Sequence, residues 1–331
     1  MEYHPGNCID VGGVRMPVMC IATCNIIDEN LRNGLNTALD LGYRRFKTTF
    51  GECNTVGIIL KECFEKNIVR REDLFISAKL PPVGNRYEDV ELFLKKYLEA
   101  LQLDYVDLYE IGSPIGFIRK EDSLFAQDEN GDVLLDLKTD IVETWKGMEE
   151  QVIAGRARTI GLACFNQSQL QRIIDHCTIK PACLSTELHV YCQEKELVSL
   201  CKRNGIAVTA FSPLGSPGLQ DVIGGFDGNK KTIPSSLKDP VIRDIARKYN
   251  KQPSQILLRF LLEYGVSIAI KSVNPKRLKE CSEIFDFELS REEFDRISDL
   301  DRGEDGRTLG GSCGTGVLND VESHPGFPWK K

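Results

Sequence analysis

Residues 89–111 read DVELFLKKYLEALQLDYVDLYEI, and this stretch decides the fold. Its first part repeats apolar residues every three or four positions, which predicts an amphipathic helix over Asp89–Leu101. Its last part, Val106–Ile111, is short and mostly apolar, as is typical of a strand that is covered on both faces. A helix followed closely by a buried strand is the repeating unit of a parallel α/β fold.

The same alternation runs through the whole chain. Short apolar runs and amphipathic patterns follow one another, and eight of each fit into about 300 residues. This count predicts a (β/α)8 TIM barrel, in which eight parallel strands close inside a ring of helices. The rival doubly wound sheet needs a glycine-rich turn after its first strand, and residues 21–25, IATCN, lack one. The predicted strands are Val18–Thr23, Arg45–Thr49, Leu74–Lys79, Val106–Ile111, Thr159–Ala163, Cys183–Glu187, Ala207–Phe211 and Val266–Ile270. The predicted helices are Glu29–Leu41, Thr55–Lys66, Asp89–Leu101, Ile141–Ala154, Gln167–His176, Gln193–Asn204, Pro240–Tyr249 and Lys276–Ile284.

Three segments lie outside this count. Ile9–Met16, with two glycines at its centre, predicts a β-hairpin ahead of the first strand. Pro253–Tyr264 is an additional predicted helix, started by its proline and followed by a glycine. The glycine-rich tail over 302–331 is expected to form a loop over one barrel mouth, although its composition alone also suits disorder. No linker divides the chain, so residues 1–331 are predicted to form a single domain.

Composition and charge exclude several classes of protein. The formal net charge is −7 and no basic stripe is present, so nucleic acid is not an expected partner. The doublets Arg44-Arg45 and Lys230-Lys231 are interpreted as solvated turns or strand ends. No apolar run reaches the roughly 18 residues of a membrane span, and the first ten residues do not resemble a signal peptide. We therefore expect a cytoplasmic protein without a membrane partner, and no heptad or dimer stripe is visible.

Cysteine and histidine usage points away from disulfides and metals. The chain has 12 cysteines, but they are scattered through apolar segments and form no CxxC pair. Reduced and mostly buried thiols are therefore expected. The four histidines show no ligand spacing among themselves or with cysteines, so no metal site is predicted.

Several longer strings resemble one protein family. The strings are LQLDYVDLY over 101–109, RREDLF over 70–75, ETWKGME over 143–149, AFSPLGS over 210–216, and IKSV over 270–273 followed by Arg277. In their order and over residues from about 9 to 300 they are similar to the aldo-keto reductases. The resemblance implies a monomeric barrel with its active site at the C-terminal mouth and NADP(H) bound extended across it. It also implies reduction of aldehydes and ketones by a Tyr acid, a Lys and an Asp that tune it, and a His that orients the substrate.

The catalytic positions of that family are mostly replaced. By the resemblance, Lys47 stands where the family has Asp, and Phe50 aligns with the catalytic Tyr across a short deletion. The lysine is kept as Lys79, whereas Gly112 takes the position of the His. Phe50 has no proton to give to a developing alkoxide, so the reductive chemistry is expected to be lost or strongly altered. An alternative is that the gap is misplaced and that Tyr43 or Tyr87 serves as the acid.

The two ends of the cofactor groove also differ. The family's Ser-Asn pair for the carboxamide aligns with Ala163 and Cys164, and its amide-bearing partner aligns with Ser185. At the other end, basic residues after the last strand keep the family pattern and suit a 2′-phosphate, although Lys271 and Arg277 could also simply solvate a helix start. NADP(H) binding is therefore predicted. The further cofactor residues that the resemblance implies are Phe211, Ser212, Leu214 and Ser216 in a pyrophosphate loop over 211–218, and Ser272, Val273 and Glu280 near the 2′-phosphate and adenine.

Two lysines are predicted to point into the barrel mouth. Lys47 and Lys79 would lie close together. Two like charges in a cleft repel each other, so a neighbouring negative charge is expected to balance them. Glu110 lies two residues before Gly112 and so on the same face of its strand, which makes it a candidate counter-charge. The alternative is that Lys47 reaches out to solvent while Glu110 pairs with a helix.

Three functional hypotheses follow. The first is an aldo-keto reductase-like protein that binds NADP(H) but has lost carbonyl reduction. The second is a working NADPH-dependent oxidoreductase with a rearranged acid and a narrow carbonyl substrate. The third is a non-redox lyase or condensing enzyme that uses Lys79 or Lys47 as a Schiff-base nucleophile, activated by the neighbouring ammonium. In each case the expected ligand is a small carbonyl compound or an apolar molecule.

Overall fold

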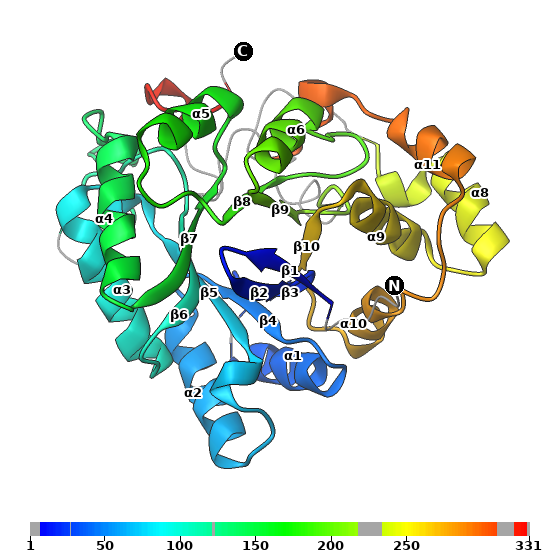
Figure 1. The fold of residues 1–331 in the computed structure, drawn as a ribbon, viewed down its shortest axis with the longest axis horizontal. Helices are drawn as coiled ribbons and strands as arrows, with labels where there is room; N and C mark the ends of the chain where they lie inside the picture. Colours follow the sequence, from blue (N-terminus) through cyan, green and yellow to red (C-terminus); the bar gives the residue numbers. More distant parts are fainter. Residues whose placement is uncertain (1–6, 27, 121–122, 218–233, 310–320, 330–331) are drawn as a thin grey trace.

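The eight strands predicted from the sequence form a closed parallel barrel (Figure 1). In the computed structural model the strand order around the barrel is β10-β3-β4-β5-β6-β7-β8-β9. The predicted TIM barrel is therefore confirmed. The strands are β3 (Met19–Ala22), β4 (Arg45–Thr48), β5 (Phe75–Leu80), β6 (Val106–Ile111), β7 (Ala157–Ala163), β8 (Cys183–Glu187), β9 (Ala207–Phe211) and β10 (Ser267–Ile270). The structure describes residues 7–26, 28–120, 123–217, 234–309 and 321–329.

The barrel strands are short and almost wholly buried because helices cover them outside and side chains fill the barrel inside. Around them run the helices seen in Figure 1. The helices are α1 (Asp28–Asp40), α2 (Cys53–Glu65), α3 (Tyr87–Leu101), α4 (Ile141–Ile153), α5 (Gln167–His176), α6 (Lys195–Arg203), α8 (Pro240–Tyr249), α9 (Pro253–Tyr264), α10 (Pro275–Ser282) and α11 (Arg291–Ser298). Short 3₁₀ turns are η1 (Arg71–Asp73), η2 (Pro82–Gly84), η3 (Ser236–Lys238), η4 (Gly303–Gly306) and η5 (Val321–Ser323).

Two features of the helical ring differ from the sequence prediction. The helix counted as additional, α9, packs directly on β10, while α8 packs on α9 and lies further out (Figure 1). The helix that covers the barrel strand is therefore α9, and the additional helix is α8. The reason is that α9 is apolar nearly all round, whereas α8 has only one apolar face. Helix α11 was not predicted, although Ser290 and Glu293 form the reciprocal capping box that starts it.

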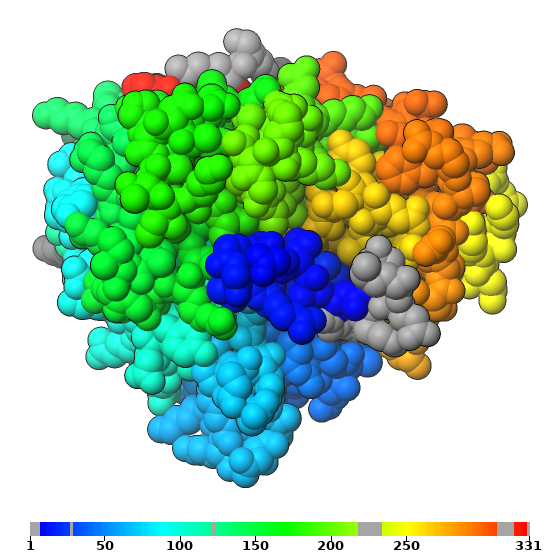
Figure 2. All heavy atoms as spheres, viewed as in Figure 1, coloured from blue at the N-terminus to red at the C-terminus, as the bar shows by residue number. Residues whose placement is uncertain are grey.

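The predicted hairpin closes the N-terminal end of the barrel. Strands β1 (Cys8–Val11) and β2 (Val14–Pro17) pair antiparallel, and both glycines of the turn have positive φ. Apolar hairpin residues pack on Phe75 and Leu108, near the starts of their strands. Figure 2 shows the hairpin atoms filling the centre of this face. The opposite, C-terminal ends of the strands are left for a site.

The C-terminal tail reaches that opposite mouth, as predicted, in the parts that the structure describes. Asn166 and Gln169, at the start of α5, donate side-chain hydrogen bonds to the carbonyls of Pro328 and Gly326. Helix α5 follows β7, so its N-terminus lies at the C-terminal mouth. Residues 310–320 lie outside the described residues. Within the described ranges, no helix is long and apolar enough to cross a membrane, and the cysteines there are free thiols.

Candidate active site

Three polar side chains from alternate strands meet inside the barrel. The Lys47 ammonium on β4 lies 2.7 Å from a carboxylate oxygen of Glu110 on β6. The same ammonium donates a hydrogen bond of 3.0 Å to the hydroxyl of Ser185 on β8, which in turn donates one of 2.5 Å to the other Glu110 oxygen. The prediction that Glu110 supplies a counter-charge is confirmed, and the alternative in which Lys47 reaches solvent is wrong.

This ion pair is deeply buried. The Glu110 side chain is fully inaccessible and that of Lys47 is 10% exposed. Burial alone would raise the pKa of the Glu110 carboxyl, but the Lys47 ammonium and the Ser185 hydroxyl outweigh burial and hold that pKa below its ordinary value. Glu110 is therefore an ionised carboxylate at neutral pH, and it neutralises the Lys47 ammonium.

A second cation lies deeper in the barrel. Arg45 donates hydrogen bonds of 3.1 Å to the hydroxyl of Ser267 and 3.0 Å to that of Thr209, and it is inaccessible to solvent. Its interpretation as part of a solvated doublet is wrong. The signal was present in the sequence, since Arg45 and Lys47 are two residues apart on one strand and so face the same side.

Lys79 lies beside Gly112, the residue that the resemblance aligns with the family's His. It pairs in register with Glu110, so its side chain enters the mouth from the neighbouring strand. A Cβ on Gly112 would lie 3.1 Å from Cγ of Lys79 and 2.5 Å from the carbonyl oxygen of Leu80. The lysine stem thus occupies space that a side chain at position 112 would need. Among the described residues the half-buried Lys79 ammonium has no hydrogen-bond or ion-pair partner.

Phe50 belongs to an aromatic cluster. Its ring meets those of Phe93 and Tyr97 edge to face, with centroids 5.6 and 5.1 Å apart. The Tyr97 hydroxyl donates to the backbone carbonyl of Lys79 at 2.9 Å rather than to the ammonium. The position aligned with the catalytic Tyr therefore presents an apolar ring without a proton donor.

The two alternative tyrosines lie elsewhere. The Tyr43 hydroxyl is buried and donates to the carbonyl of Leu278 on α10 at 2.9 Å. The Tyr87 hydroxyl bonds Glu150 on the outside of the helical ring. In the part of the chain that the structure describes, no tyrosine hydroxyl bonds the Lys79 ammonium.

The turn after β7 has an unusual backbone, and the side chains of Ala163 and Cys164 carry no amide or hydroxyl group. Cys164 has a φ of 63°, in the left-handed region where Asn is common and other residues are rare. Its N–H donates to the carbonyl of Ser185, while Ala163 before it offers no polar side chain. Burial raises the pKa of the Cys164 thiol, against the opposing effect of the Lys79 and Lys47 ammonium groups. The Ser185 hydroxyl is already engaged by the buried ion pair.

The loop after β9 shows similar backbone strain. Ser212 and Ser216 have φ values of 50° and 47°, and Gly215 between them donates its N–H to the carbonyl of Ser212. The carbonyl of Leu214 accepts from the Ser236 hydroxyl. Non-glycine residues in this region persist where the surroundings fix them, commonly at ligand sites. Phe211, half-buried at the end of β9, begins this loop; residue 218 of the predicted pyrophosphate loop lies outside the described residues.

The segment after β10 presents exposed cations. Asn274 caps α10 by accepting from the N–H of Arg277, and Gly34 on α1 approaches Val273 closely. Lys271 and Arg277 are exposed and have no side-chain ion pair within the described ranges. The remaining predicted residues lie on the same segment: half-buried Ser272, half-buried Val273 and Glu280, whose carboxylate is 3.9 Å from the Lys276 ammonium.

Comparison with known proteins decides what this barrel is. A model of the aldo/keto reductase family matches residues 25–302. The chain belongs to the aldo/keto reductase family. It is 36% identical over 293 residues to aldo-keto reductase family 1 member A1 of Gallus gallus, covering 88% of this chain and 87% of that protein. It is 33% identical to family 1 member C18 of Rattus norvegicus, with coverage of 99% and 97%. The solved aldose reductase from Schistosoma japonicum is 31% identical, covers 99% of each chain and superposes with a TM-score of 0.85.

Glu187, a buried carboxylate that was not predicted from the sequence, binds the C-terminal tail of this aldo/keto reductase family member to the barrel mouth. Glu187 ends β8 and accepts hydrogen bonds from the N–H and hydroxyl of Thr308, both at 2.6 Å, and from the N–H of Leu309 at 2.9 Å. Nε2 of His189 lies 3.0 Å from the carboxylate oxygen of Glu187 that accepts from Thr308. Burial would raise the pKa of Glu187, yet these partners keep it low. Its position at the end of a buried strand was the available signal.

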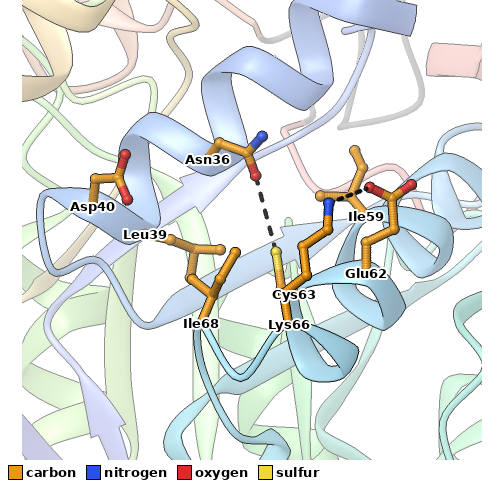
Figure 3. A pocket seen from close by; sticks show the side chains of 8 residues that line it. All are labelled: Asn36, Leu39, Asp40, Ile59, Glu62, Cys63, Lys66 and Ile68. Atoms are coloured by element: carbon orange, nitrogen blue, oxygen red, sulfur yellow. Dashed lines mark hydrogen bonds and ion pairs between the residues drawn. The ribbon is translucent and has the colours of Figure 1, made fainter.

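A hollow on the outer surface does not belong to this site. It has a volume of about 260 Å³ and lies between α1 and α2 (Figure 3). Cys63 lies in it with its thiol toward the side-chain oxygen of Asn36, and Lys66 pairs with Glu62 at the rim. Because it opens on the helical ring, away from the strand ends, it cannot receive a molecule that reacts at the barrel mouth.

Proposed function

We propose that this chain is an NADP(H)-binding member of the aldo/keto reductase family in which carbonyl reduction is lost or strongly altered. One observation carries the proposal. The aromatic ring of Phe50 stands at the position of the acid, and no tyrosine hydroxyl in the described part bonds the Lys79 ammonium. A hydride acceptor would therefore form its alkoxide without the hydroxyl proton donor that the chemistry requires.

The phosphate end of the groove fits the cofactor. Lys271 and Arg277 are exposed and free of ion pairs in the described ranges, so both can bind a 2′-phosphate by charge-assisted hydrogen bonds. The loop from Ser212 to Ser216 would hold the pyrophosphate, with Leu214 packed beside it. When bound, NADPH would supply a hydride.

The nicotinamide end fits poorly. Ala163 and Cys164 cannot replace the hydroxyl and amide that hold a carboxamide. Ser185 has a hydroxyl, but it accepts from Lys47 and donates to Glu110, which uses its only proton. Phe211 still offers a ring face for stacking. The cofactor is therefore expected to be held mainly by its phosphates, with the nicotinamide loosely placed.

The experiment has two stages. NADPH fluorescence is titrated with the protein, and the loaded protein is then mixed with a broad panel of aldehydes and ketones while NADPH absorbance is followed. We expect saturable binding and no oxidation above the protein-free rate. Oxidation of NADPH by any member of the panel at ordinary enzymatic rates, of the order of 1 s⁻¹ or more, would overturn the proposal.

A second candidate function rests on the unpaired Lys79 ammonium. In a working oxidoreductase with a narrow substrate, this ammonium could itself give the proton to the carbonyl oxygen. Substitution of Lys79 by Met would then abolish NADPH oxidation without weakening NADPH binding. Oxidation that survives in Lys79→Met would exclude this candidate.

The lysine-based lyase receives less support from the geometry. It required the Lys47 ammonium to activate Lys79, yet Lys47 is neutralised by Glu110 at 2.7 Å. Borohydride trapping with a panel of carbonyl compounds tests it. A covalent adduct on Lys79 or Lys47 would revive this hypothesis.

We also propose that the protein acts as a monomer on a small carbonyl or apolar ligand, without nucleic acid. Size-exclusion chromatography with light scattering tests the monomer directly, and a dimer mass would contradict it.

A further inference from the structure

A groove on the outside of the helical ring is lined by cations and aromatic rings. It lies between α6, α9 and α11 and has a volume of about 430 Å³. Helices α6 and α9 are neighbours in the ring (Figure 1). Helix α6 ends at Arg203, ahead of β9, and α9 ends at Tyr264, ahead of β10. This end of the groove therefore lies toward the N-terminal ends of the strands, on the hairpin side and away from the barrel mouth.

One face of α6 forms a wall of the groove. Its lining residues Lys195, Val198, Ser199 and Lys202 are spaced i, i+3, i+4 and i+7. They therefore lie along one side of the helix over two turns, or about 10 Å. Arg203 lies beside this stripe, and its guanidinium donates to the hydroxyl of Ser199 at 2.7 Å. The wall thus carries cations at both ends and an apolar residue between them.

The carboxylates around this wall are paired or distant. Glu263 lines the groove and accepts from the Arg259 guanidinium at 2.5 Å. Asp301 lies 3.1 Å from the Lys195 ammonium. Glu196 stands near the start of α6, about 10 Å along the helix from the two cations at its end, which is too far for an ion pair. None of these carboxylates therefore neutralises the last turn of α6.

Lys202 and Arg203, the cations of that last turn, are exposed and form no ion pair with any described residue. The Lys202 ammonium donates to the carbonyl of Tyr264 at 2.7 Å and lies 5.4 Å from the centroid of its ring. This contact holds the ammonium at the groove and leaves further N–H groups free. Both cations can thus form charge-assisted hydrogen bonds to a carboxylate.

The floor of the groove is aromatic. The rings of Tyr264 and Phe294 contact that of Phe260, with centroids 5.8 and 5.0 Å from it. Tyr264 and Phe294 are only half-buried, and both line the groove. Aromatic rings beside an arginine are typical of the residues that supply binding energy at protein interfaces. An apolar side chain that covers these rings would add hydrophobic burial to the attraction of charges.

We infer that this groove binds an acidic segment of a partner protein, with carboxylates on Lys202 and Arg203 and an apolar side chain over the aromatic floor. Two unpaired cations are few for a nucleic acid, whose binding rests on many phosphate contacts. A recessed groove between helices receives a peptide better than a flat membrane surface. The inference is independent of NADP(H) binding, because the residues proposed to hold the cofactor follow β9 and β10 at the opposite end of the barrel.

Fluorescence polarisation with a labelled peptide tests this inference at low salt. The two turns of α6 match about three residues of an extended chain, so the probe is a peptide of about eight residues with glutamates on each side of a central Phe-Leu pair. One comparison peptide has glutamines in place of the glutamates, and the other has serines in place of Phe-Leu. We expect the probe to bind with a Kd below about 1 mM, and each comparison peptide to bind at least about tenfold more weakly.

Matched variants assign the binding to the groove. Lys202→Met combined with Arg203→Met removes two charges, and Lys61→Met combined with Lys66→Met removes the same charge from the exposed side of α2. We expect the first pair to weaken binding of the probe by at least about tenfold and the second pair to change it little. Thermal unfolding establishes that each variant is folded. If the first pair unfolds, Arg203→Met alone, which loses only the contact with Ser199, takes its place.

Three results would overturn the inference: no binding of the probe, equal binding of the glutamine peptide, or unchanged binding in the folded groove variant. Single-stranded DNA and vesicles of anionic lipid are tested in parallel. If either bound as tightly as the probe and lost binding in the same variant, the groove would recognise negative charge alone, and an acidic peptide would not be its specific partner.

Discussion

The two ends of the proposed cofactor groove differ in how their polar side chains are engaged. At the phosphate end, after β9 and β10, Lys271 and Arg277 have no ion pair among the described residues and are open to a ligand. At the reaction end, between β4 and β8, Lys47, Glu110 and Ser185 bond one another inside the barrel. The comparison teaches that one scaffold can leave charged side chains open to a ligand at one end and pair them internally at the other.

The side chains of the reaction end depend on one another. Lys47 is balanced by Glu110, and the absence of a side chain at Gly112 leaves room for the stem of Lys79. Such pairs are coupled, so a single substitution should disturb the site. At the phosphate end Lys271 and Arg277 have no ion pair among the described residues, so single substitutions there should act on binding alone.

The largest effect is expected from breaking the buried pair. Glu110→Gln leaves the Lys47 ammonium buried without a counter-charge, which should lower the free energy of unfolding by about 3–5 kcal/mol. Chemical denaturation measures it. The control is Glu143→Gln, which breaks an exposed pair with Lys146 and should cost less than about 1 kcal/mol. A similar small loss in both variants would show that the pair does not hold the barrel interior.

The same pair sets a pH dependence. Because the pKa of Glu110 is lower folded than unfolded, its stabilisation is fully present above the unfolded value of 4.5 and is lost as pH falls through the folded value. The free energy of unfolding should therefore fall more steeply below about pH 4.5 in the natural protein than in Glu110→Gln. Parallel pH profiles would contradict this assignment.

The next effect tests the phosphate end. Arg277→Met should weaken NADPH binding by about 10- to 100-fold, the value of one charge-assisted hydrogen-bond partner, and leave NADH binding unchanged. Fluorescence titration of both nucleotides measures it. Lys276→Met, on the same turn of α10 and already near Glu280, is the control and should have little effect. Equal weakening of NADPH and NADH would mean that Arg277 does not read the 2′-phosphate.

An effect of similar size, here on stability, is expected from adding a side chain at position 112. Gly112→Ala places a Cβ 2.5 Å from the carbonyl oxygen of Leu80 and against Lys79, so it should destabilise by about 1–3 kcal/mol. Gly51→Ala, where a Cβ meets nothing within 4 Å, is the matched control. Thermal unfolding compares the two. If Gly112→Ala were as stable as Gly51→Ala, the coupling between positions 79 and 112 would be absent.

The smallest effect is expected from restoring the phenol. Phe50→Tyr adds a hydroxyl to a ring packed edge to face on Phe93 and Tyr97. Because Lys47 and Gly112 remain changed, aldehyde-dependent NADPH oxidation should stay within about tenfold of the starting protein, far below a full general-acid effect of 10²–10⁴. A gain of that full size would show that the missing acid alone limits carbonyl reduction at the reaction end.

The barrel and the family could be predicted because their signals are local and repeated. Apolar periodicity fixed the eight strands, and strings such as that over 101–109 identified the family. The exchange of α8 and α9 was missed because periodicity shows that a helix forms, not which neighbour it packs on. The doublet with Arg44 predicts a solvated Arg45, but alternation along β4 places Arg45 on the same inner face as Lys47, where hydroxyl groups bind it.

The candidate site was predictable in its residues but not in its contacts. Alternation placed Glu110 on the inner face, yet only the structure shows that it meets Lys47 and Ser185 from two other strands. The link between Glu187 and Thr308 joins residues more than one hundred positions apart, and no local pattern encodes such a contact. Long-range packing decides these partners.

The most direct test of the difference between the two ends uses halves of the cofactor. Calorimetric titration compares NADPH with 2′,5′-ADP, which carries the phosphate end, and with nicotinamide mononucleotide, which carries the reaction end. The account predicts that 2′,5′-ADP binds within about tenfold of NADPH, a difference of about 1.4 kcal/mol, and that nicotinamide mononucleotide does not bind measurably. NADPH binding more than about a hundredfold tighter than 2′,5′-ADP, or clear binding of nicotinamide mononucleotide, would show that the reaction end still holds its nicotinamide and would contradict the account.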